Sequence, residues 1–436
     1  MDGQRVCVFF IQHKGRQCRM LVKAGRSYCG QHLVEEPLDQ ATNSQHRRIP
    51  CPLDPKHSCF EHRLEHHLTI CNARVVTDLP HLRMNCNLRA CPGEGPPKVA
   101  LSSLPDDTLL TFISKIERIH ADVIGSIKES VLHLDSVEAA VAGCCGSPSM
   151  VRHLKQTSSL LAHMKAANLL DTATNPTCYV EFGAGRGQLT KWLTEAVTDT
   201  SKALFVLVDR GAQRYKHDTK LKYNDKINVK RIRVDIQHLN LEGVEGIDNY
   251  RHIVGFGKHL CGSAADMALR CLCQYQGPGV EGAVLALCCH HRCTWDSYCG
   301  LEVLQDLSVL PSEFYILTAL SSWATCNPKG VPSKEEPPAD SQKNDSFETS
   351  GSQEQHPETL ATKETVKEKK FMENRYTRLN LSAKYREEVG RKAKQVLDYC
   401  RRQYLREQGF QANLVLYVTE ESTPENVALV AKHEPR

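Results

Sequence analysis

The 436-residue sequence has no apolar run that approaches the roughly 20 residues of a membrane-spanning helix. Its first residues also lack the apolar core of a secretory signal peptide. Both absences argue against a secreted or membrane-embedded protein. We therefore expect an intracellular protein, either nuclear or cytoplasmic.

The chain is rich in cysteine, with 20 residues of this type. Because disulfides are rare in reducing compartments, we expect these thiols to be reduced or to bind metal ions. Hydrophobic residues make up 41% and charged residues 24% of the chain, which is ordinary for a soluble globular protein. The length suffices for two or three domains with a sizeable core.

Residues 1–36 hold the first candidate metal site. Its four predicted ligands are Cys7, Cys18, Cys29 and His32. Structural zinc takes four nitrogen or sulfur ligands, and the C-x-x-H pair at Cys29 and His32 is a tight chelating unit. Because this segment is poor in apolar residues, it needs such a metal to fold. The sequence therefore predicts a CCCH-type zinc finger.

Residues 48–75 hold the second candidate zinc site. Its four predicted ligands are Cys51, His57, His67 and Cys71. His67 and Cys71 are four residues apart, so they share one face of a helix predicted from Arg63 to Cys71. Three neighbours compete with them and leave a different quartet open: Cys59, His62 and His66. The arrangement resembles the CHHC zinc fingers of spliceosomal and RNA-modification proteins.

Residues 76–148 are predicted to form a linker and a helical connector. Apolar residues recur at helical spacing from Leu109 to Val123. A second helix is predicted from about Met150 to Leu170. Its early turns carry polar side chains that either reach substrate or are simply solvated: Arg152, His153, Lys155 and Gln156.

A short apolar strand then runs into a glycine-rich turn, E-F-G-A-G-R-G from Glu181 to Gly187, and into a predicted helix. The glycines are spaced G-x-G-x-G, unlike the G-x-G-x-x-G of dinucleotide-binding turns. A carboxylate at Glu181 would repel a pyrophosphate, but it suits the cationic amino-acid end and the sulfonium of S-adenosylmethionine. Gly183, Gly185 and Gly187 let the backbone pass close under such a cofactor. The pattern resembles motif I of class I S-adenosylmethionine-dependent methyltransferases.

Strands and helices alternate after this turn, which predicts an α/β fold with a doubly wound sheet over residues 150–436. One buried strand, Leu204–Val208, ends at Asp209, and another, Val229–Val234, ends at Asp235. In this fold the first acid accepts hydrogen bonds from the cofactor ribose. The second is placed to bind the adenine amino group. The predicted cofactor-binding residues are thus Glu181, Gly183, Gly185, Gly187, Asp209 and Asp235.

The fourth and fifth predicted strands, Ile253–Gly257 and Gly282–Leu287, deliver polar residues to the sheet edge where ligands bind. The motifs that follow them are K-H-L-C-G from residue 258 and C-C-H-H-R-C from residue 288. Lys258 is the first catalytic candidate, because a desolvated lysine can lose its proton or stabilise a developing oxyanion. His259 and His290 are the next candidates.

The same two motifs concentrate thiols at this edge. Cys261, Cys289 and Cys293 are predicted to shape the pocket or to bind a metal. The six cysteine and histidine residues between Cys288 and Cys299 are also candidates for a third metal site.

Residues 327–370 are rich in Pro, Ser, Glu and Lys and are predicted to be a disordered insert in the methyltransferase-like domain. A helix is predicted after them, from about Ala383 to Gln408. Residues 367–406 carry 13 Lys and Arg against 5 Asp and Glu, and residues 1–75 carry 11 against 7. Such an excess of positive charge suits an RNA phosphate backbone.

Two strands at the C-terminus, Ala412–Thr419 and Asn426–Lys432, are predicted to form a closing hairpin. An antiparallel last strand of this kind completes the seven-stranded, otherwise parallel sheet of the class I methyltransferases. We therefore expect such a sheet, preceded by two small zinc-finger units.

The order of these motifs is specific. It resembles that of the eukaryotic tRNA ribose 2′-O-methyltransferases, which act on the fourth nucleotide of the acceptor stem. The resemblance covers nearly the whole chain and implies methyl transfer from S-adenosylmethionine to a ribose 2′-hydroxyl in tRNAs for glycine, proline and histidine. It also implies that the fingers help to bind tRNA. No obligate protein partner is evident.

Two other functions stay open. A 5-methylcytosine enzyme uses thiols from the ends of these same two strands, here Cys261 and Cys289, but no proline precedes Cys261. A non-catalytic RNA-binding protein with a relic methyltransferase fold is the second alternative. The complete set of predicted cofactor residues argues against it.

Overall fold

The computed structural model describes residues 6–11, 16–22, 26–29, 32, 48–71, 74, 79–89, 95–143, 148–211, 217, 221, 224, 226–277, 279–325, 372 and 375–434. They form two compact units. The first takes its described residues from Met1–Asp78, and the second from Leu79–Asp340 and Glu364–Arg436. The predicted disordered insert, 327–370, lies outside the described residues. Across the described part, no helix combines the length and the apolarity needed to cross a membrane.

The first unit contains two short hairpins and one helix. Strands β1 (Phe10–Ile11) and β2 (Arg16–Gln17) are antiparallel, as are β3 (Arg48–Cys51) and β4 (Asp54–Phe60). Helix α1 (Leu64–Ile70) follows and confirms the helix predicted between Arg63 and Cys71. The buried cluster of the first hairpin consists of three cysteines, with only three partly buried apolar neighbours. A core this small cannot hold a fold by burial alone.

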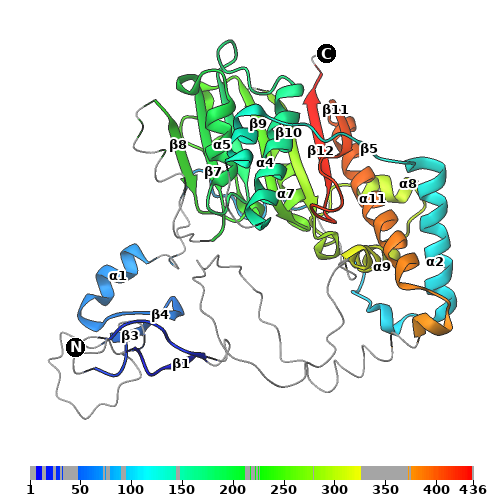
Figure 1. Ribbon diagram of the computed structural model, residues 1–436, viewed down its shortest axis with the longest axis horizontal. Helices are drawn as coiled ribbons and strands as arrows, with labels where there is room; N and C mark the ends of the chain where they lie inside the picture. Colours follow the sequence, from blue (N-terminus) through cyan, green and yellow to red (C-terminus); the bar gives the residue numbers. More distant parts are fainter. Residues whose placement is uncertain are drawn as a thin grey trace. The chain divides into compact units, whose positions relative to one another are not determined.

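The second unit is built on one eight-stranded sheet (Figure 1). Its strands are β5 (Lys128–Glu129), β6 (Thr177–Phe182), β7 (Ala203–Val208), β8 (Asn228–Ile232), β9 (His252–Cys261), β10 (Val280–Cys288), β11 (Phe410–Leu416) and β12 (Val427–His433). The order across the sheet is β5-β11-β12-β10-β9-β6-β7-β8. Strand β12 is antiparallel to both its neighbours, and the other pairings are parallel. This confirms the predicted mostly parallel sheet with an antiparallel last strand.

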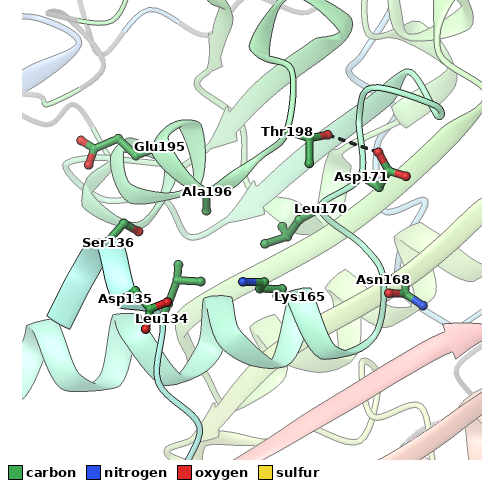
Figure 2. A pocket seen from close by; sticks show the side chains of 10 residues that line it. All are labelled: Leu134, Asp135, Ser136, Lys165, Asn168, Leu170, Asp171, Glu195, Ala196 and Thr198. Carbon is green, nitrogen blue, oxygen red and sulfur yellow. Dashed lines mark hydrogen bonds between the residues drawn. The ribbon is translucent and has the colours of Figure 1, made fainter. Parts of the chain in front are cut away.

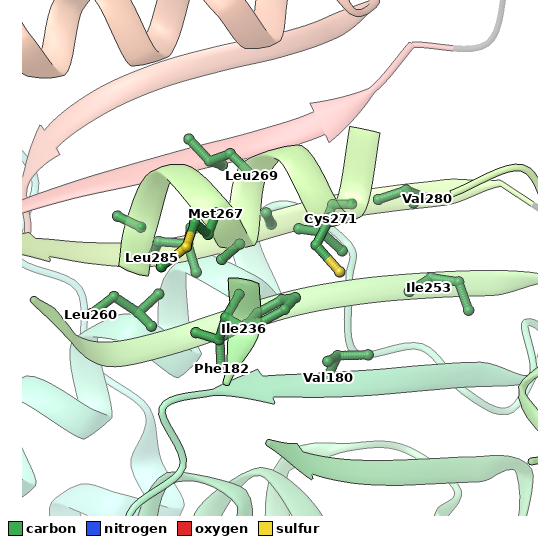
Figure 3. Close-up of a cluster of buried hydrophobic side chains, with 14 of the residues drawn as sticks. Val180, Phe182, Ile236, Ile253, Leu260, Met267, Leu269, Cys271, Val280 and Leu285 are labelled. Atoms are coloured by element: carbon green, nitrogen blue, oxygen red, sulfur yellow. The ribbon is translucent and has the colours of Figure 1, made fainter. Parts of the chain in front are cut away.

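Helices cover both faces of the sheet because its central strands are apolar on both sides. Helices α3 (Asp135–Ala142), α4 (Pro148–Ala166) and α5 (Gln188–Ala196) share one core with the face that carries Tyr179 and Phe205. Helix α7 (Ser263–Cys273) packs on the opposite face, against Val180, Phe182 and Leu285 (Figure 3).

A second layer of helices lies beside the end of the sheet that β5 and β11 form (Figure 1). It comprises α2 (Asp106–Ile119), α8 (Leu301–Asp306), α9 (Phe314–Ser321) and the long α11 (Ala383–Glu407). These helices share one hydrophobic core, to which α2 contributes the apolar stripe predicted from Leu109 onward. This core joins the helical connector to the methyltransferase-like domain.

Two expected boundaries shift in the structure, and one strand is added. Helix α4 ends at Ala166 rather than near Leu170. A short strand, β5, adds an eighth member to the expected seven. Strand β9 continues to Cys261, so the K-H-L-C motif lies within the strand rather than after it. The parallel pairing of Cys261 with Cys288 on β10 holds that extension in place.

Candidate active site and metal centres

The glycine-rich turn joins β6 to α5 and has the backbone that its sequence requires. Gly183, Gly185 and Gly187 all have positive φ, at 65°, 49° and 75°. A side chain is strained in this region, so the conformation explains why glycine stands at each position. A Cβ at Gly183 would also lie 3.2 Å from the carbonyl oxygen of His259, whereas a Cβ at Gly185 would meet open space. The turn thus packs on β9 at one glycine and leaves room for a ligand at another.

Glu181 lies under this turn and is buried, with 4% of its surface exposed. Its carboxylate accepts hydrogen bonds from the backbone N–H of Thr190 (3.2 Å) and from the Thr190 hydroxyl. Burial raises the pKa of Glu181 to about 7, although the bonds from Thr190 act in the opposite direction. The side chain predicted to face the cofactor is therefore tied to the first turn of α5.

Asp209 and Asp235 follow β7 and β8 on the same sheet edge. Asp209 accepts hydrogen bonds from the backbone N–H groups of Gly185 and Gly211, each at 2.7 Å. Asp235 accepts from the backbone of Gln237 at 3.1 Å and lies 3.8 Å from the guanidinium of Arg210. The structure thus brings Asp209 into contact with the glycine turn, and Asp235 lies beside Arg210, the residue after Asp209. Their assigned roles in binding ribose and adenine remain predictions.

Lys258 projects from β9 toward the start of α4. Its Nζ donates a hydrogen bond to the carbonyl oxygen of His153 at 2.8 Å. Desolvation lowers the pKa of Lys258 to about 7, against the opposing influence of the Glu181 carboxylate. At physiological pH, Lys258 is therefore present in both its charged and its neutral form. A general acid or base works best when its pKa lies near the working pH in this way.

His259 is exposed beside Lys258. Its ring meets the ring of His153 edge-on, with centroids 6.0 Å apart. Desolvation, together with the nearby charge of Lys258, lowers the pKa of His259. The early turn of α4 therefore does reach the candidate site, through His153. The sequence left open whether this turn was merely solvated.

Three thiols meet where β9 and β10 end. Cys261 and Cys288 are register partners, and their Sγ atoms are 3.9 Å apart. With Cys289 they form a group whose sulfur atoms all lie within 4.8 Å of one another. Hydrogen bonds from the other two thiols lower the pKa of Cys261, the exposed member of the group. Cys293 lies elsewhere, within 3.0 Å of the Arg401 guanidinium.

His290, the third catalytic candidate, is fully buried. Its Nε2 lies 2.6 Å from the carboxylate of Asp398, which also pairs with Arg401 at 3.0 Å. The Arg401 guanidinium donates two further bonds to Asp266, at 2.9 and 2.7 Å. This network ties the loop after β10 and helix α7 to helix α11. A direct contact of His290 with substrate would require the network to open.

The first finger brings its four predicted ligands together within 4.8 Å: Cys7, Cys18, Cys29 and His32. The Nδ1 atom of His32 lies 3.5 Å from the sulfur of Cys7 and 3.4 Å from that of Cys29. The sulfurs of Cys18 and Cys29 are 3.9 Å apart. Tetrahedral zinc with ordinary bond lengths places two sulfurs about 3.8 Å apart and sulfur and nitrogen about 3.5 Å apart. The donor set therefore fits zinc.

The second finger assembles the predicted quartet rather than its rivals. The group within 4.8 Å consists of Cys51, His57, His67 and Cys71. The two sulfurs are 3.6 Å apart, and the two Nε2 atoms 3.2 Å apart. Neither His62 nor His66 belongs to this group, and both are exposed. The alternative quartets that the sequence left open are thus excluded among the described residues.

Several basic side chains of helix α11 form ion pairs within the protein, so fewer of them can bind RNA phosphates than the composition suggests. Lys392 pairs with Glu117 at 2.8 Å, and Lys394 pairs with Glu425. Arg401 is buried in the network with Asp266. Much of the positive charge of this stretch therefore serves the packing of α11 against its neighbours.

A separate cavity of about 320 Å³ lies between α3, α4 and α5 (Figure 2). It is bordered by Leu170, Asp171 and Thr198, which precede β6 and β7. The amino ends of the strands therefore surround it, on the edge opposite to the glycine turn. It is distinct from the candidate active site.

Two partners of the site were not foreseen from the sequence. Thr190 binds Glu181 from α5, and Glu425 accepts the backbone N–H of Cys289 at 3.1 Å. Glu425 lies 136 residues from its partner, so only the fold brings that pair together. Thr190 lies nine residues from Glu181, and the strand-helix turn between them was a signal that could have found it, because side chains of the first helical turn lie near the end of the strand.

Comparisons with known proteins agree with this geometry. Residues 155–432 match the family model described as Methyltransferase TRM13. Residues 5–33 match the CCCH zinc finger in TRM13 protein, and residues 48–72 match the U11-48K-like CHHC zinc finger.

Relatives extend the match to nearly the whole chain. The tRNA:m(4)X modification enzyme TRM13 homolog of Mus musculus is 31% identical over 99% of this chain and 94% of its own length. The Homo sapiens homolog is 30% identical over 98% of this chain and 94% of its own length. The TRM13 enzyme of Schizosaccharomyces pombe is 30% identical over 89% of this chain and 96% of its own length. The chain therefore belongs to the TRM13 methyltransferase family, with its CCCH and CHHC zinc-finger domains.

Proposed function

We propose that this chain transfers a methyl group from S-adenosylmethionine to the ribose 2′-hydroxyl of nucleotide 4 in the tRNA acceptor stem. The observation that carries the proposal is a half-buried lysine, Lys258, on the sheet edge that also holds the glycine turn. The relatives are named as tRNA:m(4)X modification enzymes, which supports tRNA as the substrate. The resemblance seen in the sequence adds the tRNAs for glycine, proline and histidine as the preferred substrates.

The residues of the turn fit the cofactor. Gly185 faces open space. The carboxylate of Asp209 accepts a hydrogen bond from the Gly185 N–H, so an acid already stands where the cofactor ribose would bind. Asp235 stands one strand further along for the adenine. S-adenosylmethionine, when bound there, supplies an electrophilic methyl group.

The acceptor hydroxyl is a weak nucleophile and needs help to lose its proton. Lys258 can give that help in two ways. In its neutral form it accepts the proton, and in its charged form it stabilises the developing oxyanion. His153 holds the Nζ atom of Lys258 through its carbonyl oxygen, so the amine is positioned before substrate arrives.

Analysis of the methylated nucleosides tests the proposal. Unmodified tRNA is incubated with the protein and methyl-labelled S-adenosylmethionine, digested, and its nucleosides are separated. We expect the label in a 2′-O-methylnucleoside from position 4. Label in a methylated base would overturn the proposal.

Base methylation is the second candidate, because the structure leaves the Cys261 thiol exposed and near Cys289. In that reaction one thiol adds covalently to the cytosine ring. A trapped covalent complex between the protein and RNA would support it. The relic, non-catalytic alternative predicts instead that calorimetry detects no binding of S-adenosylmethionine.

A further inference from the structure

The thiols at the ends of β9 and β10 are placed by the fold rather than by proximity in sequence. Parallel pairing sets Cys261 opposite Cys288, although 27 residues separate them. Cys289 then adopts a left-handed backbone with φ of 53°, which is unusual for a residue with a side chain. This conformation brings a third sulfur to the same point.

The backbone around the thiols is fixed from both sides. The Gly262 N–H donates to the carbonyl oxygen of Cys288 at 3.0 Å, and the Cys289 N–H donates to Glu425 at 3.1 Å. The Ser263 hydroxyl lies 3.1 Å from that of Thr294. Such a held geometry reduces the ordering that a ligand must impose when it binds.

The spacing of the sulfurs matches that of a zinc site in the same chain. The sulfurs of Cys261 and Cys288 are 3.9 Å apart, as are those of Cys18 and Cys29 in the first finger. This is close to the edge of a zinc–thiolate tetrahedron, about 3.8 Å, and far from the roughly 2 Å of a disulfide. Thiolates select soft metals such as zinc.

We propose that Cys261, Cys288 and Cys289 bind a third zinc ion, on the sheet edge that carries Lys258. Among the described residues the group has three members, so the site has an open fourth position. Three protein ligands with an open position are typical of catalytic rather than structural zinc. Cys261 is exposed, so solvent can reach the group. The proposal is compatible with methylation of the ribose and incompatible with base methylation, in which Cys261 and Cys289 would act as free thiols.

Zinc content tests the proposal on the full-length protein. Purified under reducing conditions, the wild type is expected to hold three zinc ions per chain, and Cys261→Ala two. The matched control is Cys273→Ala, a half-buried cysteine of α7 outside the group, which should retain three. Equal zinc content in the wild type and in Cys261→Ala would overturn the proposal. Circular dichroism of each variant verifies that it is folded.

A second measurement needs no variant. Iodoacetamide labelling of the native protein, read by peptide mass spectrometry, reports whether Cys261 is free. We expect slow alkylation of Cys261 in zinc-loaded protein and at least tenfold faster alkylation after chelation. Equal rates, or a Cys261–Cys288 disulfide under the same reducing conditions, would contradict the third site.

Discussion

At the residue scale, Lys258 is the side chain on which the proposed chemistry depends most. It combines a half-buried position, a hydrogen bond to the carbonyl of His153 and a pKa lowered to about 7 by desolvation. Desolvation dominates this shift, and the Glu181 carboxylate acts against it. General bases of this kind contribute roughly 10²- to 10⁴-fold to a rate.

We predict that Lys258→Ala lowers kcat by about 10²-fold or more while the affinity for S-adenosylmethionine stays near that of the wild type. Single-turnover methyl transfer and calorimetry measure the two quantities. Near-normal turnover in a folded Lys258→Ala variant would show that another group activates the hydroxyl.

The pH profile separates the two possible roles of Lys258. If the neutral amine is the base, the wild-type rate should rise as the pH passes about 7. Below this pH Lys258 is an ammonium group, which cannot accept a proton, and above it the amine is neutral. Lys258→Arg, which keeps its charge, would then remain inactive at every pH. Substantial activity in Lys258→Arg with no rise near pH 7 would instead identify a cation that stabilises the oxyanion.

Glu181 gives a prediction for stability. Burial raises its pKa to about 7 in the folded protein, above its ordinary value of 4.5. Between these values the unfolded chain ionises while the folded chain stays protonated, so the free energy of unfolding falls as pH rises. Glu181→Gln removes this dependence and keeps an acceptor for Thr190. Its stability relative to the wild type should therefore increase from pH 4 to pH 8, by at most about 3 kcal/mol. A constant difference, measured by thermal unfolding without cofactor, would contradict the raised pKa.

At the element scale, the sequence predicted the strands and helices well where the pattern was strong. Apolar runs identified β7 and β10, and the 3.6-residue spacing identified α2 and α11. The extension of β9 to Cys261 was missed, because its last residues include a lysine and a histidine that resemble a loop. Pairing with β10, a tertiary interaction, decides the end of that strand.

For helix α11 too, tertiary pairing decides what the sequence could not predict, here the partners of its charged side chains. Its excess of lysine and arginine suggested a surface for RNA, but the sequence does not reveal which of these charges face carboxylates. Glu117, Glu425 and Asp266 lie on elements remote in the chain and pair with α11 only in the fold. For the same reason, His290 was predicted as a catalytic candidate although Asp398 holds it in the interior.

The buried network that anchors α11 should be costly to break. Asp398→Ala leaves Arg401 and His290 buried without a shared carboxylate, and loss of one partner in a buried ion pair typically costs about 3–5 kcal/mol. Urea unfolding measures this loss. The control, Glu195→Ala, removes only an exposed pair with Lys191 and should cost less than about 1 kcal/mol. Similar costs for the two variants would refute the structural importance of the network.

At the scale of the whole molecule, two compact units divide the chain. The second has its own large core, whereas the first depends on its metal ligands. We therefore expect His67→Ala to lose one zinc ion and to raise the KM for tRNA, because the resemblance assigns tRNA binding to the fingers. Its affinity for S-adenosylmethionine should not change. His66→Ala, the exposed neighbour outside the quartet, should leave all three quantities as in the wild type. An unchanged KM in His67→Ala would remove the second finger from tRNA binding.

The grouping of the four cysteine and histidine residues in each finger was predictable, because zinc coordination imposes a spacing on the sequence itself. The mostly parallel character of the sheet also followed from the alternation of strands and helices. The group of three thiols was only partly foreseen, since the partnership of Cys261 with Cys288 depends on strand register. Features set by local chain geometry were thus predictable, and features set by pairing of distant segments were not.

The most direct test of the proposed methyl transfer removes a single oxygen atom from the substrate. A tRNA with 2′-deoxyribose at nucleotide 4 lacks the proposed acceptor oxygen, and the matched control carries the same change at nucleotide 5. With labelled S-adenosylmethionine, we expect no methyl transfer to the first tRNA and near-normal transfer to the second. Continued labelling of the tRNA that lacks the oxygen at nucleotide 4 would contradict the proposed reaction.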